Sequence, residues 1–77
     1  MQVTIKLFAS LAETAGWREK VCTLPAGATV AEGWTAATGK SVLPPKVLCA
    51  VNLNYCDLAT ALKDADELAF FPPVTGG

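Results

Sequence analysis

The strongest constraint on the fold is one well-marked helix that lies between two pairs of strand-like segments. Thr29 and Glu32 form a capping box at its start, and Gly39 supplies a left-handed stop. Between these signals the apolar residues share one helical face: Val30, Trp34 and Ala37. A helix with one apolar face must cover a sheet. We therefore expect Trp34 to fill the core between helix and sheet, and Gly33 to allow a strand to approach closely.

The segment before this helix predicts two strands. Residues 2–8 alternate, with Val3, Ile5 and Leu7 on one face and Gln2, Thr4, Lys6 and Phe8 on the other. Ser10 and Glu13 predict a capping box for a short helix over residues 10–15, which Gly16 stops. Residues 17–24 predict the second strand, paired with the first.

The segment after the helix predicts two more strands. A loop ends at Pro44-Pro45, and residues 47–51 form a strand followed by a turn at residues 52–54. Residues 58–62 make a short ordered connection, and a turn at Asp64-Ala65-Asp66 leads to the last strand, residues 67–71.

This order predicts an α+β fold in which a mixed sheet packs on one main helix. The last strand runs parallel to the first, since a crossover helix lets distant strands pair. A chain of 77 residues is expected to form a single domain, residues 1–77, with a flexible tail over residues 72–77. Hydrophobic residues make up 52% of the sequence, so we expect a partner to cover part of the apolar surface.

Charge and hydropathy narrow the class of partner. The net charge is −1, which argues against nucleic-acid binding, and the chain has neither a signal-like start nor an 18-residue apolar run. We expect no membrane insertion and a cytoplasmic location. The segment from Asp57 to the end is acidic, and its acids either solvate a turn or steer the chain towards a basic partner: Asp57, Asp64, Asp66 and Glu67.

Cysteine usage predicts neither a disulfide scaffold nor a metal site. Cys22, Cys49 and Cys56 are odd in number, form no C-x-x-C pair and have no histidine beside them. Cys49 is expected to be a small buried hydrophobe, and a persulfide on Cys56 is a minor alternative. Without histidine, a G-x-S-x-G turn or a phosphate loop, the chain is expected to use no cofactor and to catalyse nothing alone.

The carboxyl-terminal residues predict the chemistry. Without Cβ atoms, Gly76 and Gly77 can lie extended in a narrow channel and present a carboxylate to a partner's active site. Pro72 and Pro73 remove two backbone donors, so the sheet ends there and a stiff segment projects outward. A carboxylate becomes electrophilic once ATP converts it to an acyl-adenylate, and a glycyl adenylate is the least hindered one. This is the chemistry of a carrier.

Four segments carry a resemblance to the small-subunit family of molybdopterin synthase, which are ubiquitin-like β-grasp sulfur carriers: LFASLAETAG, AVN, DADELAF and FFPPVTGG. The resemblance spans nearly the whole chain, and the tail is its most specific part. One departure is Ala65, where the family usually places glycine in the turn before the last strand. If that turn needs a positive φ, alanine costs about 1 kcal/mol there.

The resemblance implies a reaction cycle with three partners. An E1-like adenylyltransferase would activate Gly77 with ATP, and a sulfurtransferase would replace the adenylate with sulfur. The resulting thiocarboxylate would dock in the large synthase subunit, in a heterotetramer, and deliver sulfur to cyclic pyranopterin monophosphate. Gly76 would permit threading, and Pro72, Pro73, Val74 and Thr75 would set the reach.

The two phenylalanines before the tail are expected to have different roles. Phe70 and Phe71 point to opposite faces of a strand, so one enters the core and the other a partner surface; both could instead be core residues. Two other functions share the fold and the diglycine: a sulfur carrier for thiamine biosynthesis or tRNA thiolation, and a ubiquitin-like modifier joined to lysines.

Overall fold

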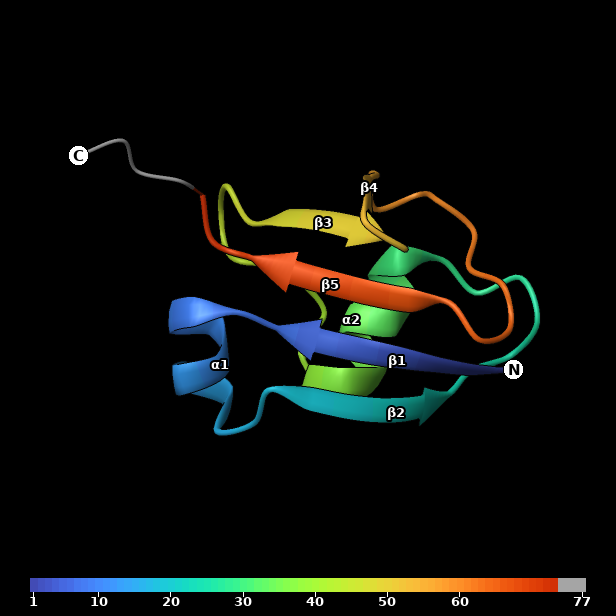
Figure 1. Cartoon of the computed structure of the whole chain (residues 1–77), viewed down its shortest axis with the longest axis horizontal. Helices are drawn as coiled ribbons and strands as arrows, with labels where there is room; N and C mark the ends of the chain where they lie inside the picture. Colours follow the sequence, from blue (N-terminus) through green and yellow to red (C-terminus); the bar gives the residue numbers. More distant parts are fainter. Residues whose placement is uncertain (74–77) are drawn as a thin grey trace.

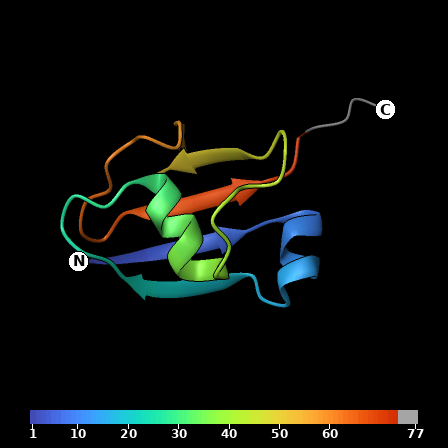
Figure 2. The same cartoon turned by 180° about the vertical axis from the view of Figure 1, so that it is seen from behind.

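The chain folds into a mixed sheet with one helix packed across its rear face (Figures 1 and 2). The computed structural model describes residues 1–73, and Val74, Thr75, Gly76 and Gly77 lie outside it. The strands are β1 (Gln2–Leu7), β2 (Glu19–Thr23), β3 (Leu48–Val51), β4 (Asn54–Tyr55) and β5 (Glu67–Phe71), and the helices are α1 (Ala9–Ala15) and α2 (Val30–Thr38). In residues 1–73 neither helix is long and apolar enough to cross a membrane.

The first and last strands form the centre of the sheet. The order is β2-β1-β5-β3-β4. β1 pairs parallel with β5, placing Ile5 beside Leu68, whereas β2 and β3 pair antiparallel with these central strands. The expected parallel pairing is confirmed, and so is the ubiquitin-like β-grasp class, an α+β fold with a mixed sheet on one main helix.

The core lies between α2 and the face of the sheet that α2 covers. Val3, Ile5 and Leu7 are buried on β1, as their alternation predicts, and α2 contributes a buried Trp34. The Nε1 of Trp34 donates a hydrogen bond to the carbonyl of Val42, 3.2 Å away, so its polar atom is satisfied.

Gly33 lets α2 approach the sheet. A Cβ at this position would lie 2.9 Å from Cδ2 of Leu68 and 3.4 Å from Cδ1 of Leu62. The contact is with side chains of the sheet and of the loop before β5, so the close approach predicted from the sequence is confirmed.

The signals at the ends of α2 are confirmed, but the predicted cap of α1 is wrong. The side chain of Thr29 accepts from the backbone of Glu32, Glu32 returns the bond, and Gly39 ends the helix at φ 75°. α1 instead begins after Phe8, whose side chain cannot accept a hydrogen bond and so does not cap the helix. Gly16 ends α1 as expected. Ser10 lies inside α1 because the extended β1 backbone continues to Phe8 and the helix starts immediately after it.

The region around residues 52–55 differs from the prediction. The turn is shorter than residues 52–54: Asn52 and Leu53 have φ of 50° and 71°, and Asn54 already begins β4. Two positive φ values are typical of a tight hairpin turn whose twist matches that of the strands it joins. A two-residue strand with both side chains exposed has no detectable period, so the sequence pattern missed β4.

The turn before β5 places alanine in the left-handed region. Ala65 has φ 71°, so this turn does need a positive φ at the position where the family usually places glycine. Its amide still donates to the carbonyl of Gln2, at 2.8 Å, which holds the strained turn against the start of β1.

We predict that Ala65→Gly raises the free energy of unfolding by about 1 kcal/mol, because glycine adopts a positive φ without a Cβ penalty. Gly39→Ala is the matched reverse change: φ is 75°, and among the described residues nothing lies within 4 Å of the added Cβ, so backbone strain alone should cost about 1 kcal/mol. Denaturant unfolding measures both. Equal midpoints for Ala65→Gly and the parent chain would contradict this account.

Candidate functional site

The predicted partner-binding residues of the described chain gather where β1 and β5 end. Parallel strands finish at the same edge of a sheet, and here the amide of Phe8 donates to the carbonyl of Phe70, at 3.2 Å. Pro72 and Pro73 follow β5 without regular structure and are half-buried. Val74, Thr75, Gly76 and Gly77, which carry the predicted carrier chemistry, lie outside the described residues.

Phe70 and Phe71 face opposite sides of the sheet. Phe70 is fully buried, and its ring stacks edge-on against Trp34 with centroids 4.9 Å apart. Phe71 lies on the other face, with its ring 5.8 Å from that of Tyr55. The opposite orientation of the two rings is confirmed, and the alternative that both are core residues is wrong. Phe70, also named as a partner-binding residue, is a core residue, whereas contact of Phe71 with a partner stays a prediction. Phe70 therefore anchors β5 and leaves Phe71 available at the surface.

Phe71 belongs to an apolar strip on the open face of the sheet. Its members are Phe8, Leu48, Tyr55 and Phe71. Leu48 pairs with Phe71, and Tyr55 pairs with Ala50, which lies two residues after Leu48 on β3, so these side chains project from the same face of the sheet. Phe8, Leu48 and Tyr55 are 47%, 39% and 75% exposed. An exposed apolar group beside the tail is typical of a protein-binding surface.

The sequence could have indicated one member of this strip. The alternation of residues 2–8 places Phe8 opposite the buried Leu7, so an aromatic ring had to emerge on the polar face. The positions of Leu48 and Tyr55 needed the register of β3 with β5 and β4, which no local pattern carries. The sequence analysis named none of these three as a candidate site residue.

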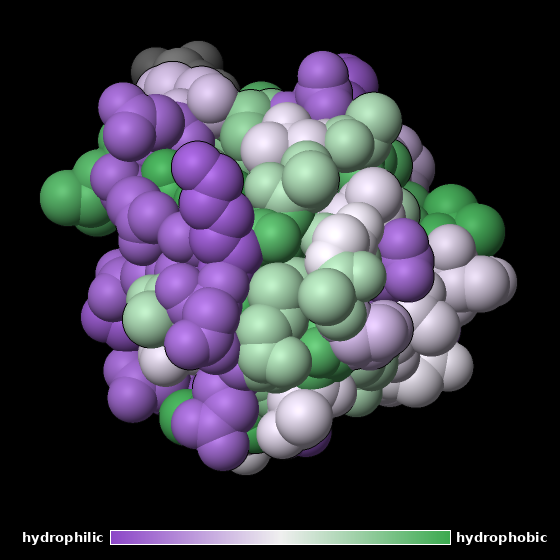
Figure 3. All heavy atoms as spheres, turned by 90° about the vertical axis from the view of Figure 1, so that its right-hand side faces the viewer, coloured by the Kyte–Doolittle hydropathy of each residue, from purple (hydrophilic) through white to green (hydrophobic). Residues whose placement is uncertain are grey.

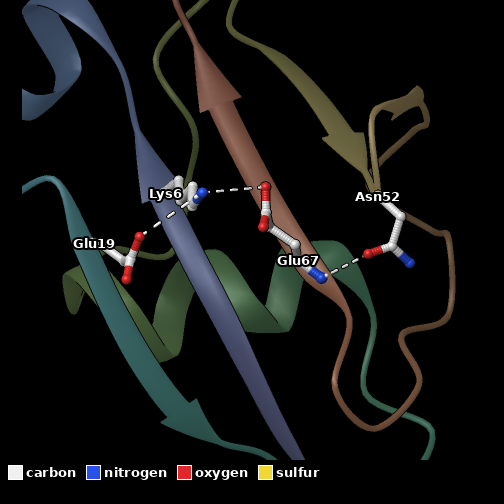
Figure 4. A network of polar contacts seen from close by, with 4 residues as sticks. All are labelled: Lys6, Glu19, Asn52 and Glu67. Atoms are coloured by element: carbon white, nitrogen blue, oxygen red, sulfur yellow. Dashed lines mark hydrogen bonds and ion pairs between the residues drawn. The ribbon is translucent and has the colours of Figure 1, made fainter.

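The other half of the open face is polar. Lys6 on β1 lies between Glu19 of β2 and Glu67 of β5, with N–O distances of 3.8 and 3.3 Å (Figure 4). Exposed ion pairs of this kind contribute little to stability. Seen from the end of the molecule where β1 begins, hydrophilic residues gather along one side (Figure 3). The open face thus divides into a charged half and the apolar strip.

Asp66 plays a structural part that neither interpretation of the acidic segment anticipated. It is 9% exposed; its Oδ1 accepts from Nδ2 of Asn52 and its Oδ2 from the amide of Lys63, both at 2.8 Å. Asn52 in turn accepts from the amide of Glu67, at 2.9 Å (Figure 4). This clasp ties the β3–β4 turn to the base of β5. Asp66 is therefore part of the folded framework and not a freely solvated group.

Within residues 1–73 no group of three or more histidine, cysteine or acidic side chains is arranged to hold a metal ion. The described residues provide an exposed apolar strip beside the end of β5.

Comparison with known proteins gives a family. The model described as the ThiS family matches residues 5–77. The molybdopterin synthase sulfur carrier subunit of Haemophilus influenzae is 48% identical over 44 residues, which cover 57% of this chain and 49% of that protein. The matched segment therefore spans about half the length of this curated relative.

Two solved structures extend the comparison to the whole chain. The small archaeal modifier protein 1 from Haloferax volcanii has a TM-score of 0.87 and 32% identity, and the match covers 100% of both chains. A complex of subunits 1 and 2 of the molybdopterin-converting factor from Helicobacter pylori contains a chain with a TM-score of 0.69 and 25% identity, again over 100% of both.

We predict that alanine substitutions of the two phenylalanines differ in how much stability they remove. Phe70→Ala removes a fully buried ring and should lower the free energy of unfolding by about 3–5 kcal/mol, whereas Phe71→Ala removes a surface ring and should cost about 1 kcal/mol or less. Denaturant unfolding compares the two. Similar losses would show that Phe71 is needed for the fold and is not free to serve a partner.

Proposed function

Because the chain belongs to the ThiS family, we propose that it is a sulfur carrier that serves molybdopterin synthase. The carboxyl group of Gly77 reacts with ATP to give an acyl-adenylate and pyrophosphate. A sulfur nucleophile then displaces AMP, leaving a thiocarboxylate, which donates its sulfur to cyclic pyranopterin monophosphate. The observation that carries this proposal is the family match over residues 5–77, which includes the diglycine.

The fold supports this use of the tail. β5 is a central strand, and the burial of Phe70 against Trp34 fixes its end. Pro72 and Pro73 then leave the sheet from a defined point, without donors that could extend β5. A tail that starts from a rigid base reaches a partner's active site at a lower entropic cost than one that starts from a loose strand.

The apolar strip supports a docking role for the surface beside the tail. We assign partner binding to Phe71, Pro72, Pro73, Val74, Thr75 and Gly76, and add Phe8, Leu48 and Tyr55. The partners are the synthase large subunit, an E1-like adenylyltransferase and a sulfurtransferase. The Helicobacter pylori structure contains subunits 1 and 2 of the molybdopterin-converting factor in one complex, which supports pairing with a large subunit here.

A second function has its own support. The modifier from Haloferax volcanii matches this chain over its full length at a TM-score of 0.87, so a ubiquitin-like modifier whose Gly77 is joined to lysines is the alternative. A sulfur carrier for thiamine biosynthesis or tRNA thiolation would use the same thiocarboxylate. Lysine adducts in cells identify the modifier, and the large subunit that co-purifies separates the sulfur pathways.

We predict that deleting Gly77, or adding one alanine after it, abolishes sulfur transfer and leaves stability unchanged, because neither change touches the core. The assay reconstitutes molybdopterin formation from the chain, the adenylyltransferase, a sulfur source, the large subunit and the pterin precursor. Phe71→Ala serves as the comparison, since it should weaken partner binding but keeps the terminal group that carries the sulfur. Molybdopterin formation by either terminal variant would overturn the proposal.

We further predict that replacing Cys22, Cys49 and Cys56 by alanine preserves the sulfur load. A thiocarboxylate exchanges one carboxyl oxygen for sulfur, and this mass gain should appear on the C-terminal fragment and resist thiol reductants. The loaded protein is prepared with the adenylyltransferase, ATP and a sulfur source and is analysed by fragment mass. A gain that maps to a cysteine and disappears on reduction would assign the sulfur to a persulfide instead.

A further inference from the structure

Two cysteine sulfur atoms lie in contact across the β3–β4 hairpin. Cys49 is on β3, and Cys56 directly follows β4; their Sγ atoms are 3.3 Å apart. The amide of Cys56 donates to the carbonyl of Cys49, at 3.1 Å, and the thiol of Cys49 donates to the carbonyl of Cys56, at 3.3 Å. The two residues therefore face each other in the hairpin, both as free thiols.

The hairpin holds this pair in register. Ala50 pairs with Tyr55 and Val51 with Asn54, so Cys49 and Cys56 are the next opposed positions. Opposed residues of an antiparallel pair have Cα atoms about 4.5–5.5 Å apart, which lies within the span of a disulfide. Closing the bond requires the two sulfur atoms to approach further, with no rearrangement of the strands.

The two thiols differ in access to a reagent. Cys49 is buried, whereas Cys56 is half-buried and lines an open groove with Tyr55 and Asp57. Burial, followed by the neighbouring Cys56, raises the pKa of Cys49 to about 12, so Cys49 is a poor first nucleophile. Cys22 is buried on β2, at the opposite edge of the sheet.

We propose that Cys49 and Cys56 form a reversible intramolecular disulfide by exchange with a small disulfide such as oxidised glutathione. The thiolate of Cys56 attacks one sulfur of the small disulfide, forms a mixed disulfide and releases one thiol. Cys49 then attacks the Cys56 sulfur and releases the second thiol. The two cysteines are oxidised, the small disulfide is reduced to two thiols, and the protons of the cysteines pass to those thiols.

The bond would fasten a weakly held part of the sheet. β4 has two residues and pairs in the sheet only with β3 among the described strands, so a covalent link next to Tyr55 restrains the hairpin at its open end. This inference is independent of the proposed sulfur chemistry at Gly77, because neither cysteine takes part in that cycle.

The test treats the folded chain with oxidised glutathione and follows its mass. Cleavage after Lys46 and Lys63 places both cysteines in the fragment 47–63 and Cys22 in the fragment 21–40. We expect the fragment 47–63 to become lighter by two hydrogens, to carry no glutathione, and to regain its mass on treatment with dithiothreitol.

Single variants identify the order of the two steps. Cys49→Ala should stop at a glutathione adduct on Cys56, and Cys56→Ala should stay largely unmodified because Cys49 is buried. Cys22→Ala is the control and should oxidise like the parent chain. The proposal is overturned if the parent chain ends as a glutathione adduct, links Cys22, forms dimers or does not react; these outcomes need no variant to fold.

Discussion

The parallel pairing of β1 with β5 is the contact on which the rest of the structure depends. It joins residues from opposite ends of the chain, such as Ile5 and Leu68, and places them at the centre of the sheet. Since α2 lies across the same strands, their inward side chains form the core with Trp34. The pairing also brings Phe8 and Phe71 to one edge, so the arrangement that closes the core also positions the surface beside the tail.

The sequence predicted those parts of the fold whose signals are local. Thr29, Glu32 and Gly39 act within a few residues of each other, and alternation on β1 is visible without knowledge of its neighbours. The failures concern residues whose structure is set by strand pairing and not by a residue pattern. β4 exists because it pairs with β3, and α1 begins after Phe8, not at Ser10, because the backbone stays extended up to Phe8.

The candidate site likewise has features that the sequence predicts and features that it does not. The proposed chemistry of the diglycine follows from residue type, and the opposite orientation of Phe70 and Phe71 follows from strand geometry. The clasp of Asp66 does not, because its partner Asn52 is brought to it by the hairpin. The contact between Cys49 and Cys56 is intermediate: the two lie symmetrically about the turn at Asn52 and Leu53, a spacing that becomes informative only once the turn is known to have two residues.

The short outer strand also bears on self-association. Unpaired backbone groups at the edge of a sheet can template the addition of another chain, which is the first step of aggregation. Here β4 offers the backbone of only two residues. At the opposite edge, β2 carries Lys20 on its inward side, where the ammonium group lies over the ring of Trp17 and donates to the carbonyl of Ala37. Both edges therefore disfavour the addition of a further strand from another chain.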